Sequence, residues 1–188
     1  MEAIQKNKRY TYTDYLTWDD DMRYELIDGV PYMMSAPNLK HQETTGEVYG
    51  QLRNFLKEKP CRPFIAPVDV RLNAKKGDND VVQPDVLVVC DHSKLEDGKS
   101  VKGAPDFIVE VLSPSTTSYD CFVKLNKYMW AGVREYWIIN LDEKIVLTHI
   151  LTGNNYITKT YGADCNFIPV SVLEGCVIDL KAIFPEES

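Results

Sequence analysis

Two stretches of this 188-residue chain decide its fold: Pro84–Val89, with the sequence PDVLVV, and Phe107–Leu112, with the sequence FIVEVL. Each is a continuous apolar run rich in β-branched residues, which is typical of a central strand covered on both faces. Asp85 opens the first run and Glu110 lies inside the second. A buried carboxylate either becomes neutral or finds a cation, so both positions require an explanation.

If the two strands lie side by side, Asp85 and Glu110 become neighbours. At an effective dielectric constant of about 20, two carboxylates about 4 Å apart repel each other by about 4 kcal/mol. A bound divalent cation turns this repulsion into attraction. Oxygen ligands suit Mg²⁺ and Mn²⁺, which polarise a phosphate and lower the pKa of an attacking water. The pair is therefore a candidate metal site.

Upstream of Asp85 the sequence predicts a β-hairpin and a long helix. Asp28-Gly29 separates two alternating runs, so strands are expected at residues 23–27 and 30–34. Apolar residues then recur at helical spacing between Asn38 and Lys59, and Pro60 ends that helix.

Downstream of Glu110 the sequence predicts a helix that begins with caps in Ser113–Thr116 and ends at Ala131-Gly132. A buried strand is expected at residues 135–139, and further strands at residues 144–151, 156–161 and 176–179. This mixed order predicts an α/β fold: a central mixed β-sheet flanked by helices, with an N-terminal β-hairpin and a β-rich C-terminal extension. We find no linker, so residues 1–188 are expected to form a single domain.

The charge balance argues against a general nucleic-acid coat protein. The chain has 21 Lys and Arg against 28 Asp and Glu, a formal net charge of −7, so as a whole it repels nucleic acids and anionic membranes. A local basic groove is still compatible with that total. We expect no membrane partner and a cytoplasmic location, because residues 1–9 are polar and no apolar run approaches the roughly 18 residues of a membrane span.

The five cysteines are an odd number and contain no Cys-x-x-Cys pair, which argues against a disulfide framework and against a structural zinc site. We therefore expect reduced thiols.

A metal-dependent phosphodiesterase needs a lysine beside its acids, to stabilise charge that develops on the phosphate. The expected position, two residues after Glu110, is Leu112. Lys124 is a substitute if the following helix packs back over the strand, and Tyr128 lies one turn further along the same face. Alternatively, Lys124 forms an exposed ion pair with Asp120, four residues earlier, worth a few tenths of a kcal/mol.

Six segments occur in a fixed order between about Tyr12 and Ile150. They are Tyr24–Gly29, Asn38–His41, Gln83–Val86, Val109–Ser115, Tyr119-Asp120 with Lys124, and Ala131–Trp137. The ordered set resembles the Uma2 family of endonucleases, within the PD-(D/E)xK, restriction-endonuclease-like superfamily. The resemblance implies a restriction-endonuclease-like core that depends on Mg²⁺, with Mn²⁺ as a substitute. It also implies that Asp85 and Glu110 are metal ligands and that the lysine has moved from strand to helix.

Two further residues have competing interpretations. Glu25 lies in an otherwise apolar strand, and the superfamily often supplies an additional acid from an N-terminal element, so Glu25 is either a third ligand that orients a water or a hairpin residue. In the second case it faces solvent or pairs with Arg23 or a lysine. His41 either contacts phosphate, acts as a base or orients a ligand, or it is a capping or surface residue near a helix N-terminus.

The leading hypothesis is an endonuclease that hydrolyses phosphodiester bonds in DNA. Mg²⁺ held by Asp85 and Glu110 activates water, Lys124 stabilises the transition state, and Glu25 assists. A homodimer is expected because cutting two strands favours two sites. The alternative is a catalytically inactive nuclease fold that binds nucleic acid or protein, which the acidic net charge and the missing strand lysine favour. A two-carboxylate glycosidase explains the acids but leaves Lys124 without a role.

Overall fold

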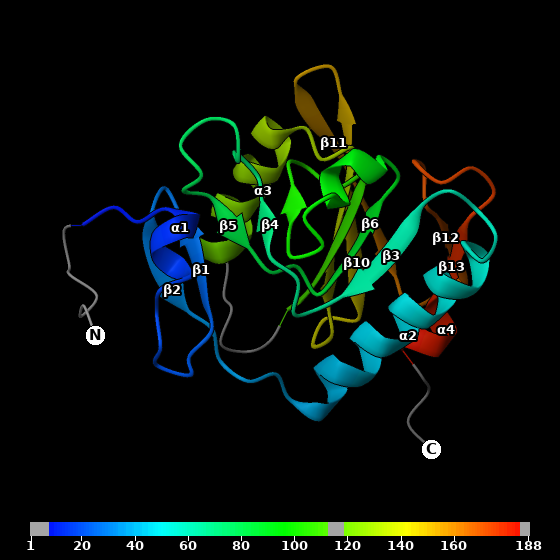
Figure 1. The fold of residues 1–188 in the computed structure, drawn as a ribbon. Coiled ribbons are helices and arrows are strands. Elements are labelled where there is room, and N and C mark those ends of the chain that lie inside the picture. Colours follow the sequence, from blue (N-terminus) through cyan, green and yellow to red (C-terminus); the bar gives the residue numbers. More distant parts are fainter. Residues whose placement is uncertain (1–7, 113–118, 185–188) are drawn as a thin grey trace.

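A computed structural model describes residues 8–112 and 119–184 of the chain (Figure 1). Its centre is a six-stranded mixed sheet in which β8 and β9 are parallel and all other neighbours are antiparallel. In spatial order its strands are β11 (Asn155–Gly162), β10 (Ile145–Thr152), β9 (Glu135–Asn140), β8 (Phe107–Leu112), β6 (Val86–Val89) and β3 (Arg62–Ile65). The α/β fold predicted from the sequence is confirmed.

A second, smaller sheet contains the predicted N-terminal hairpin. In spatial order its strands are β2 (Val30–Met33), β1 (Tyr24–Ile27), β5 (Val81–Val82), β4 (Val70–Arg71) and β7 (Val101–Lys102). Asp28 and Gly29 form the hairpin turn with φ of 52° and 73°, which is why the turn takes this dipeptide. A side chain at Gly29 would also meet the Tyr10 carbonyl oxygen at 2.8 Å. The short helix α1 (Tyr12–Tyr15) packs beside this sheet.

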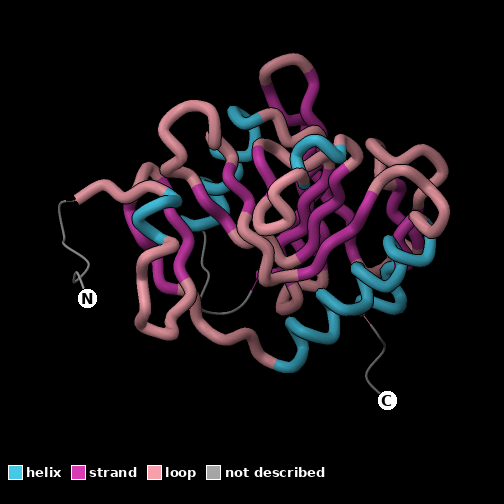
Figure 2. Tube along the Cα trace, in the orientation of Figure 1, coloured by secondary structure: helices cyan, strands magenta, loops and turns pink. Residues whose placement is uncertain are grey.

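Helices cover the two faces of the large sheet. On one face lies α2 (Leu39–Phe55), together with the C-terminal elements β12 (Phe167–Pro169), β13 (Val177–Asp179) and α4 (Leu180–Ile183). On the other face lie α3 (Tyr119–Ala131) and part of the small sheet. The connection between β6 and β7 contains a short 3₁₀ helix, η1 (His92–Leu95). Figure 2 shows α2 lying against the strand layer of the large sheet, and the β1–β2 hairpin beside that layer, at the left of the view.

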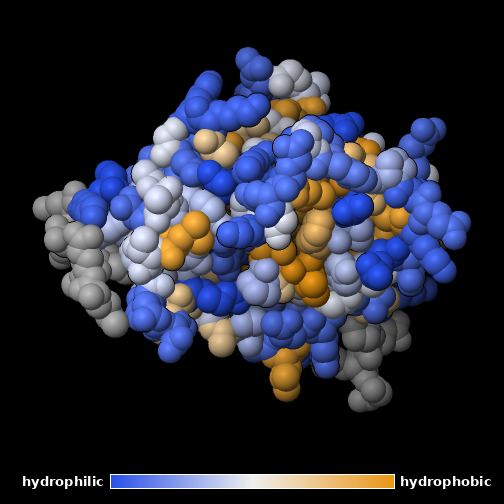
Figure 3. All heavy atoms as spheres, in the orientation of Figure 1, coloured by the Kyte–Doolittle hydropathy of each residue, from blue (hydrophilic) through white to orange (hydrophobic). Residues whose placement is uncertain are grey.

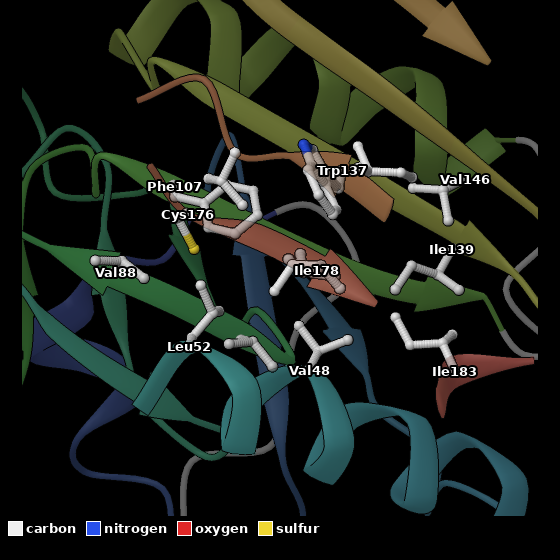
Figure 4. Packing of buried hydrophobic residues seen from close by; sticks show 14 of the residues in the cluster. Val48, Leu52, Val88, Phe107, Trp137, Ile139, Val146, Cys176, Ile178 and Ile183 are labelled. Atoms are coloured by element: carbon white, nitrogen blue, oxygen red, sulfur yellow. The ribbon is translucent and has the colours of Figure 1, made fainter. Parts of the chain in front are cut away.

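The two apolar runs are buried on both faces, as predicted. Val86, Val88 and Val109 pack on the α2 side, whereas Leu87 and Ile108 pack on the α3 side. Figure 4 shows Val88 of β6 in the same packed layer as Val48 and Leu52 of α2. Because side chains alternate along a strand, Asp85 and Glu110 belong to the α3 side.

The prediction of reduced cysteines is wrong for Cys61 and Cys90, which form a disulfide. They are 29 residues apart in the sequence, but they extend the antiparallel β3–β6 pair by one position beyond Arg62 and Val89. Strand pairing therefore brings them together with a Cα–Cα distance of 4.0 Å. Cys165 and Cys176 are free thiols.

The predicted element boundaries hold within a few residues for the hairpin, the long helix and the strands of the large sheet. The predicted caps in Ser113–Thr116 lie outside the described residues.

In the part of the chain that the structure describes, no helix is both long and apolar enough to cross a membrane. One face of the molecule shows scattered hydrophobic side chains among hydrophilic ones (Figure 3).

Candidate active site

Asp85 and Glu110 lie opposite each other across the β6–β8 pair. The register joins Val86 to Val109, so the next step of the antiparallel ladder joins Asp85 to Glu110. Directly opposed residues have Cβ atoms about 4.5–5.5 Å apart. The Val111 backbone N–H donates a hydrogen bond of 2.8 Å to Asp85 Oδ2 and fixes that carboxylate at the end of the strand.

Lys124 reaches this pair from α3. Its Nζ lies 3.1 Å from Glu110 Oε1 and 2.9 Å from Glu25 Oε2, and the side chain is only 15% exposed. The Tyr128 hydroxyl, one turn further on, donates a 2.7 Å hydrogen bond to the same Glu110 oxygen. The alternative interpretation, in which Lys124 is exposed and pairs with Asp120, is wrong about the exposure of Lys124, because this side chain is enclosed between two carboxylates. The side chain of Asp120 lies outside the described part of the chain.

Glu25 is buried in β1 and belongs to the same cluster. Its Oε1 accepts a 2.8 Å hydrogen bond from the Gln83 backbone N–H, and its Oε2 binds the Lys124 ammonium. The structure therefore excludes the solvent-facing interpretation of Glu25 and confirms the pairing with a lysine.

His41 lies in the first turn of α2 and points at Asp85. The helix is capped by Asn38, whose side chain accepts the His41 backbone N–H at 2.9 Å. The imidazole is buried, and its Nε2 lies 3.2 Å from Asp85 Oδ2. Of the two interpretations, the capping or surface residue is wrong, since Asn38 is the cap and the ring contacts a site acid.

These side chains share one cavity of about 360 Å³. Four elements supply them: Glu25 comes from the hairpin, His41 from α2, Asp85 and Glu110 from the sheet, and Lys124 from α3. Residues of β2 and of the segment that follows it also line the cavity, and most of them are apolar. The cavity size falls within the range of pockets that bind small ligands.

Comparison with known proteins assigns the chain to a family. A family model named Uma2, described as "Putative restriction endonuclease", matches residues 12–181. The chain belongs to the Uma2 family. A relative, "Uncharacterized protein slr1290" from Synechocystis sp., is 32% identical over 156 residues, which cover 80% of this chain and 79% of the relative.

A solved structure shows the same fold as this Uma2 chain. It is described as a putative nuclease belonging to DUF820 from Anabaena variabilis, and it has a TM-score of 0.75 and 20% sequence identity. The superposition covers 93% of this chain and 97% of the other. The restriction-endonuclease-like fold predicted from the sequence is confirmed.

The charged groups that line the cavity shift one another's pKa values. Burial raises the pKa of Glu110 to about 7; the Lys124 ammonium opposes this shift, and the carboxylates of Asp85 and Glu25 add to it. Burial alone lowers the pKa of Lys124, but Glu110 and Glu25 raise it above its ordinary value, so the ammonium stays charged. For His41, burial lowers the pKa, while the hydrogen bond to Asp85 and the charges of Asp85 and Glu110 outweigh burial and raise it.

Sequence reasoning missed the role of Gln83, a buried residue that organises the N-terminal side of the site. Its Oε1 accepts hydrogen bonds from Arg23 Nε at 3.0 Å and Arg23 Nη2 at 2.6 Å. Its Nε2 donates to Asp69 Oδ1 at 2.8 Å. The sequence did place Gln83 directly before Pro84-Asp85, which could have indicated a role near the site. An uncharged amide is neither an acid, a base nor a typical metal ligand, so it was not selected as a site residue.

The carboxylates of this cavity fit the way in which proteins usually hold Mg²⁺. Among the residues that the structure describes, no group of three or more His, Cys, Asp and Glu side chains is placed to hold a metal ion. Mg²⁺, however, is usually held by one or two carboxylates together with water and substrate phosphate oxygens. Asp85 and Glu110 supply two such carboxylates. Burial is the main cause of the raised pKa of Glu110, and the charges of Asp85 and Glu25 add to it, so a cation bound beside these acids would offset their repulsion.

Proposed function

We propose that the protein is a metal-dependent endonuclease that hydrolyses phosphodiester bonds in DNA. Asp85 and Glu110 would hold Mg²⁺, or Mn²⁺ as a substitute. When bound, the cation polarises the phosphate and lowers the pKa of the attacking water. The observation that carries the proposal is the position of the Lys124 ammonium, 3.1 Å from Glu110 although it comes from a helix rather than from the strand.

Each side chain has a definite task in this proposal. Lys124 stabilises the negative charge that develops on the phosphate, because its ammonium is fixed and remains charged in a buried setting. Glu25 holds that ammonium from the other side and assists as an additional acid. His41 orients the Asp85 carboxylate together with the Val111 N–H.

The description of the Uma2 family as a restriction endonuclease supports this proposal. The N-terminus of α2, at the rim of the cavity, adds a favourable electrostatic environment for a phosphate.

The test is cleavage of plasmid DNA with Mg²⁺ or Mn²⁺, compared with the same reaction in a chelator. Asp85→Asn and Lys124→Met are expected to lose cleavage by about 100- to 1000-fold. Matched controls are Asp142→Asn and Lys159→Ala, which alter exposed residues away from the cavity and should cleave like the wild type. Equal cleavage by the site variants and the wild type in parallel preparations would show that the activity belongs to a contaminant or another site.

One observation favours a second candidate, a catalytically inactive nuclease fold that binds nucleic acid or protein. The site acids already have partners within the chain: Lys124 and Tyr128 bind Glu110, and His41 binds Asp85. Isothermal titration calorimetry separates the two functions. Heat of Mn²⁺ binding that disappears in Asp85→Asn supports the enzyme, whereas no binding and no stabilisation by metal support the inactive module.

Homodimerisation, a cytoplasmic location and a single domain over residues 1–188 stay predictions from the sequence. Sedimentation of the purified chain tests the first: a species of twice the 21.5 kDa chain mass is expected.

A further inference from the structure

The β1–β2 hairpin presents one of its faces to the site cavity. Alternate residues of a strand share a face, so Arg23 and Glu25 point the same way. The register places Tyr32 opposite Glu25, and the Met34 N–H donates to the Arg23 carbonyl at 2.8 Å, which places Met34 opposite Arg23. All four side chains line the cavity. A cation, an acid of the site, an aromatic ring and a thioether therefore form one continuous wall.

Arg23 keeps its charge available for an anion. Its guanidinium is oriented by the neutral Gln83 amide oxygen, and among the described residues it makes no ion pair with a carboxylate. Lys124, by contrast, is already shared between Glu25 and Glu110. A guanidinium is well suited to phosphate because its fork of N–H donors matches the phosphate oxygens.

Tyr32 gives the same wall a surface for a base. Tyr32 is 38% exposed and stands next to the site acid Glu25. An aromatic face beside phosphate-binding groups gains nothing from a base that is paired and stacked inside a duplex. It does bind the open face of an unpaired base, which contributes about 1–3 kcal/mol per base in proteins that bind single strands.

The small number of cations at the cavity points to the same substrate. Duplex binding depends on many Lys and Arg contacts along the phosphate backbone, whereas, among the described residues, the lysine and arginine residues that line this cavity are Arg23 and Lys124. A cavity of about 360 Å³ with one charged anchor and one aromatic platform suits a short, unpaired segment better.

Building on the proposed function, we propose that the substrate is DNA with an unpaired nucleotide at the cut site, held by Arg23 on a phosphate and by Tyr32 on the base. Arg23 and Tyr32 are thus specificity-determining residues. The unpaired nucleotide occurs in a single strand or in an internal loop of a duplex.

The test measures binding in a chelator, so that it does not depend on cleavage. Fluorescence anisotropy compares a labelled single strand, its blunt duplex, and the same duplex with an unpaired internal loop. The single strand and the looped duplex are expected to bind about tenfold or more tightly than the blunt duplex, because no base pair has to be opened. Equal affinity for all three DNAs overturns the proposal.

Variants assign the effect to the wall. Tyr32→Ala is expected to weaken binding of the single strand by roughly 5- to 150-fold, whereas Tyr32→Phe, which keeps the ring, binds like the wild type. Phe167→Ala is the matched control, because it removes an exposed ring from β12 at the other end of the molecule. If Tyr32→Ala binds as tightly as Phe167→Ala, the proposal is wrong.

Arg23→Gln should weaken binding to every DNA and should lower the slope of log affinity against log salt concentration by about one, the value for one phosphate contact. Arg62→Gln, at an exposed site on β3, should change neither the affinity nor the slope. Thermal melts of each variant confirm that it is folded. Cleavage with Mg²⁺ is scored separately. Cleavage of the blunt duplex as fast as of the single strand contradicts this inference alone, and absence of cleavage of any DNA contradicts the proposed function alone.

Discussion

Glu110 and Glu135 are buried acids on the parallel neighbours β8 and β9, yet they serve opposite purposes. Glu135 is fully buried and accepts hydrogen bonds from Trp137 Nε1 at 2.7 Å and the Val172 N–H at 2.9 Å. It thereby ties the C-terminal extension to the sheet. Glu110 instead binds the Lys124 ammonium and lines the cavity.

The difference shows that burial of an acid does not by itself identify a functional residue. Burial raises the pKa of both carboxyls. What separates them is their partners: neutral N–H donors bind Glu135, whereas Glu110 binds the Lys124 ammonium and lines the cavity. The same substitution in both residues therefore should have different consequences.

The largest expected effect is on catalysis. Glu110→Gln removes the charge of one proposed metal ligand at constant shape, so DNA cleavage should fall by about 100- to 1000-fold. Cleavage rates under single-turnover conditions measure this loss. If both variants, Glu110→Gln and Glu135→Gln, show the same loss of cleavage rate per folded molecule, the account is wrong that Glu110 acts in catalysis and Glu135 in stability.

The next effect is on stability. Glu135→Gln leaves only one carbonyl oxygen for two buried N–H donors, which should lower the free energy of unfolding by about 1–3 kcal/mol. Urea denaturation measures that change, and the cleavage rate of the folded variant should be unchanged. A variant as stable as the wild type would mean that Glu135 does not anchor the extension.

A third effect concerns pH. The folded-state pKa of Glu110, about 7, exceeds the unfolded value of about 4.5, so the folded protein binds the proton more tightly. The stabilisation is fully present below the unfolded value and is lost as pH rises from about 4.5 to about 7. Stability should therefore fall across that window, and less steeply in Glu110→Gln. An unchanged slope in the variant would contradict this origin.

The smallest effect comes from Tyr128, whose hydroxyl lowers the pKa of Glu110 by a hydrogen bond. Tyr128→Phe should move the acidic limb of the cleavage profile to higher pH by less than about one unit. Tyr156→Phe is the control, because that hydroxyl binds the Val133 carbonyl instead of a site acid. A matching shift in both variants would exclude a specific role for Tyr128.

The sequence was sufficient for those features that depend on local pattern. Continuous β-branched runs predicted the strands of Asp85 and Glu110, and Asp28-Gly29 predicted the hairpin, since each signal lies within a few residues. The sequence placed Asp85 beside Glu110 only on the condition that their strands are neighbours, and the β6–β8 pair of the structure meets that condition.

Contacts between distant segments could not be predicted in this way. The hydrogen bonds from Arg23 to Gln83 join residues that are 60 positions apart in the sequence. The Cys61–Cys90 disulfide depends on the register of two strands. His41 illustrates the same limit: a single histidine at a helix start is ambiguous until the helix is placed against Asp85. Only the packed chain decides such contacts.

The most direct test of the account is a crystal structure of the protein with Mn²⁺, read from the anomalous density. The account predicts one ion in contact with both the Asp85 and the Glu110 carboxylates, and no ion there in Asp85→Asn. Saturating Mn²⁺ that leaves this pair without density, or that binds only elsewhere, would contradict a metal-dependent centre built on Asp85, Glu110 and Lys124.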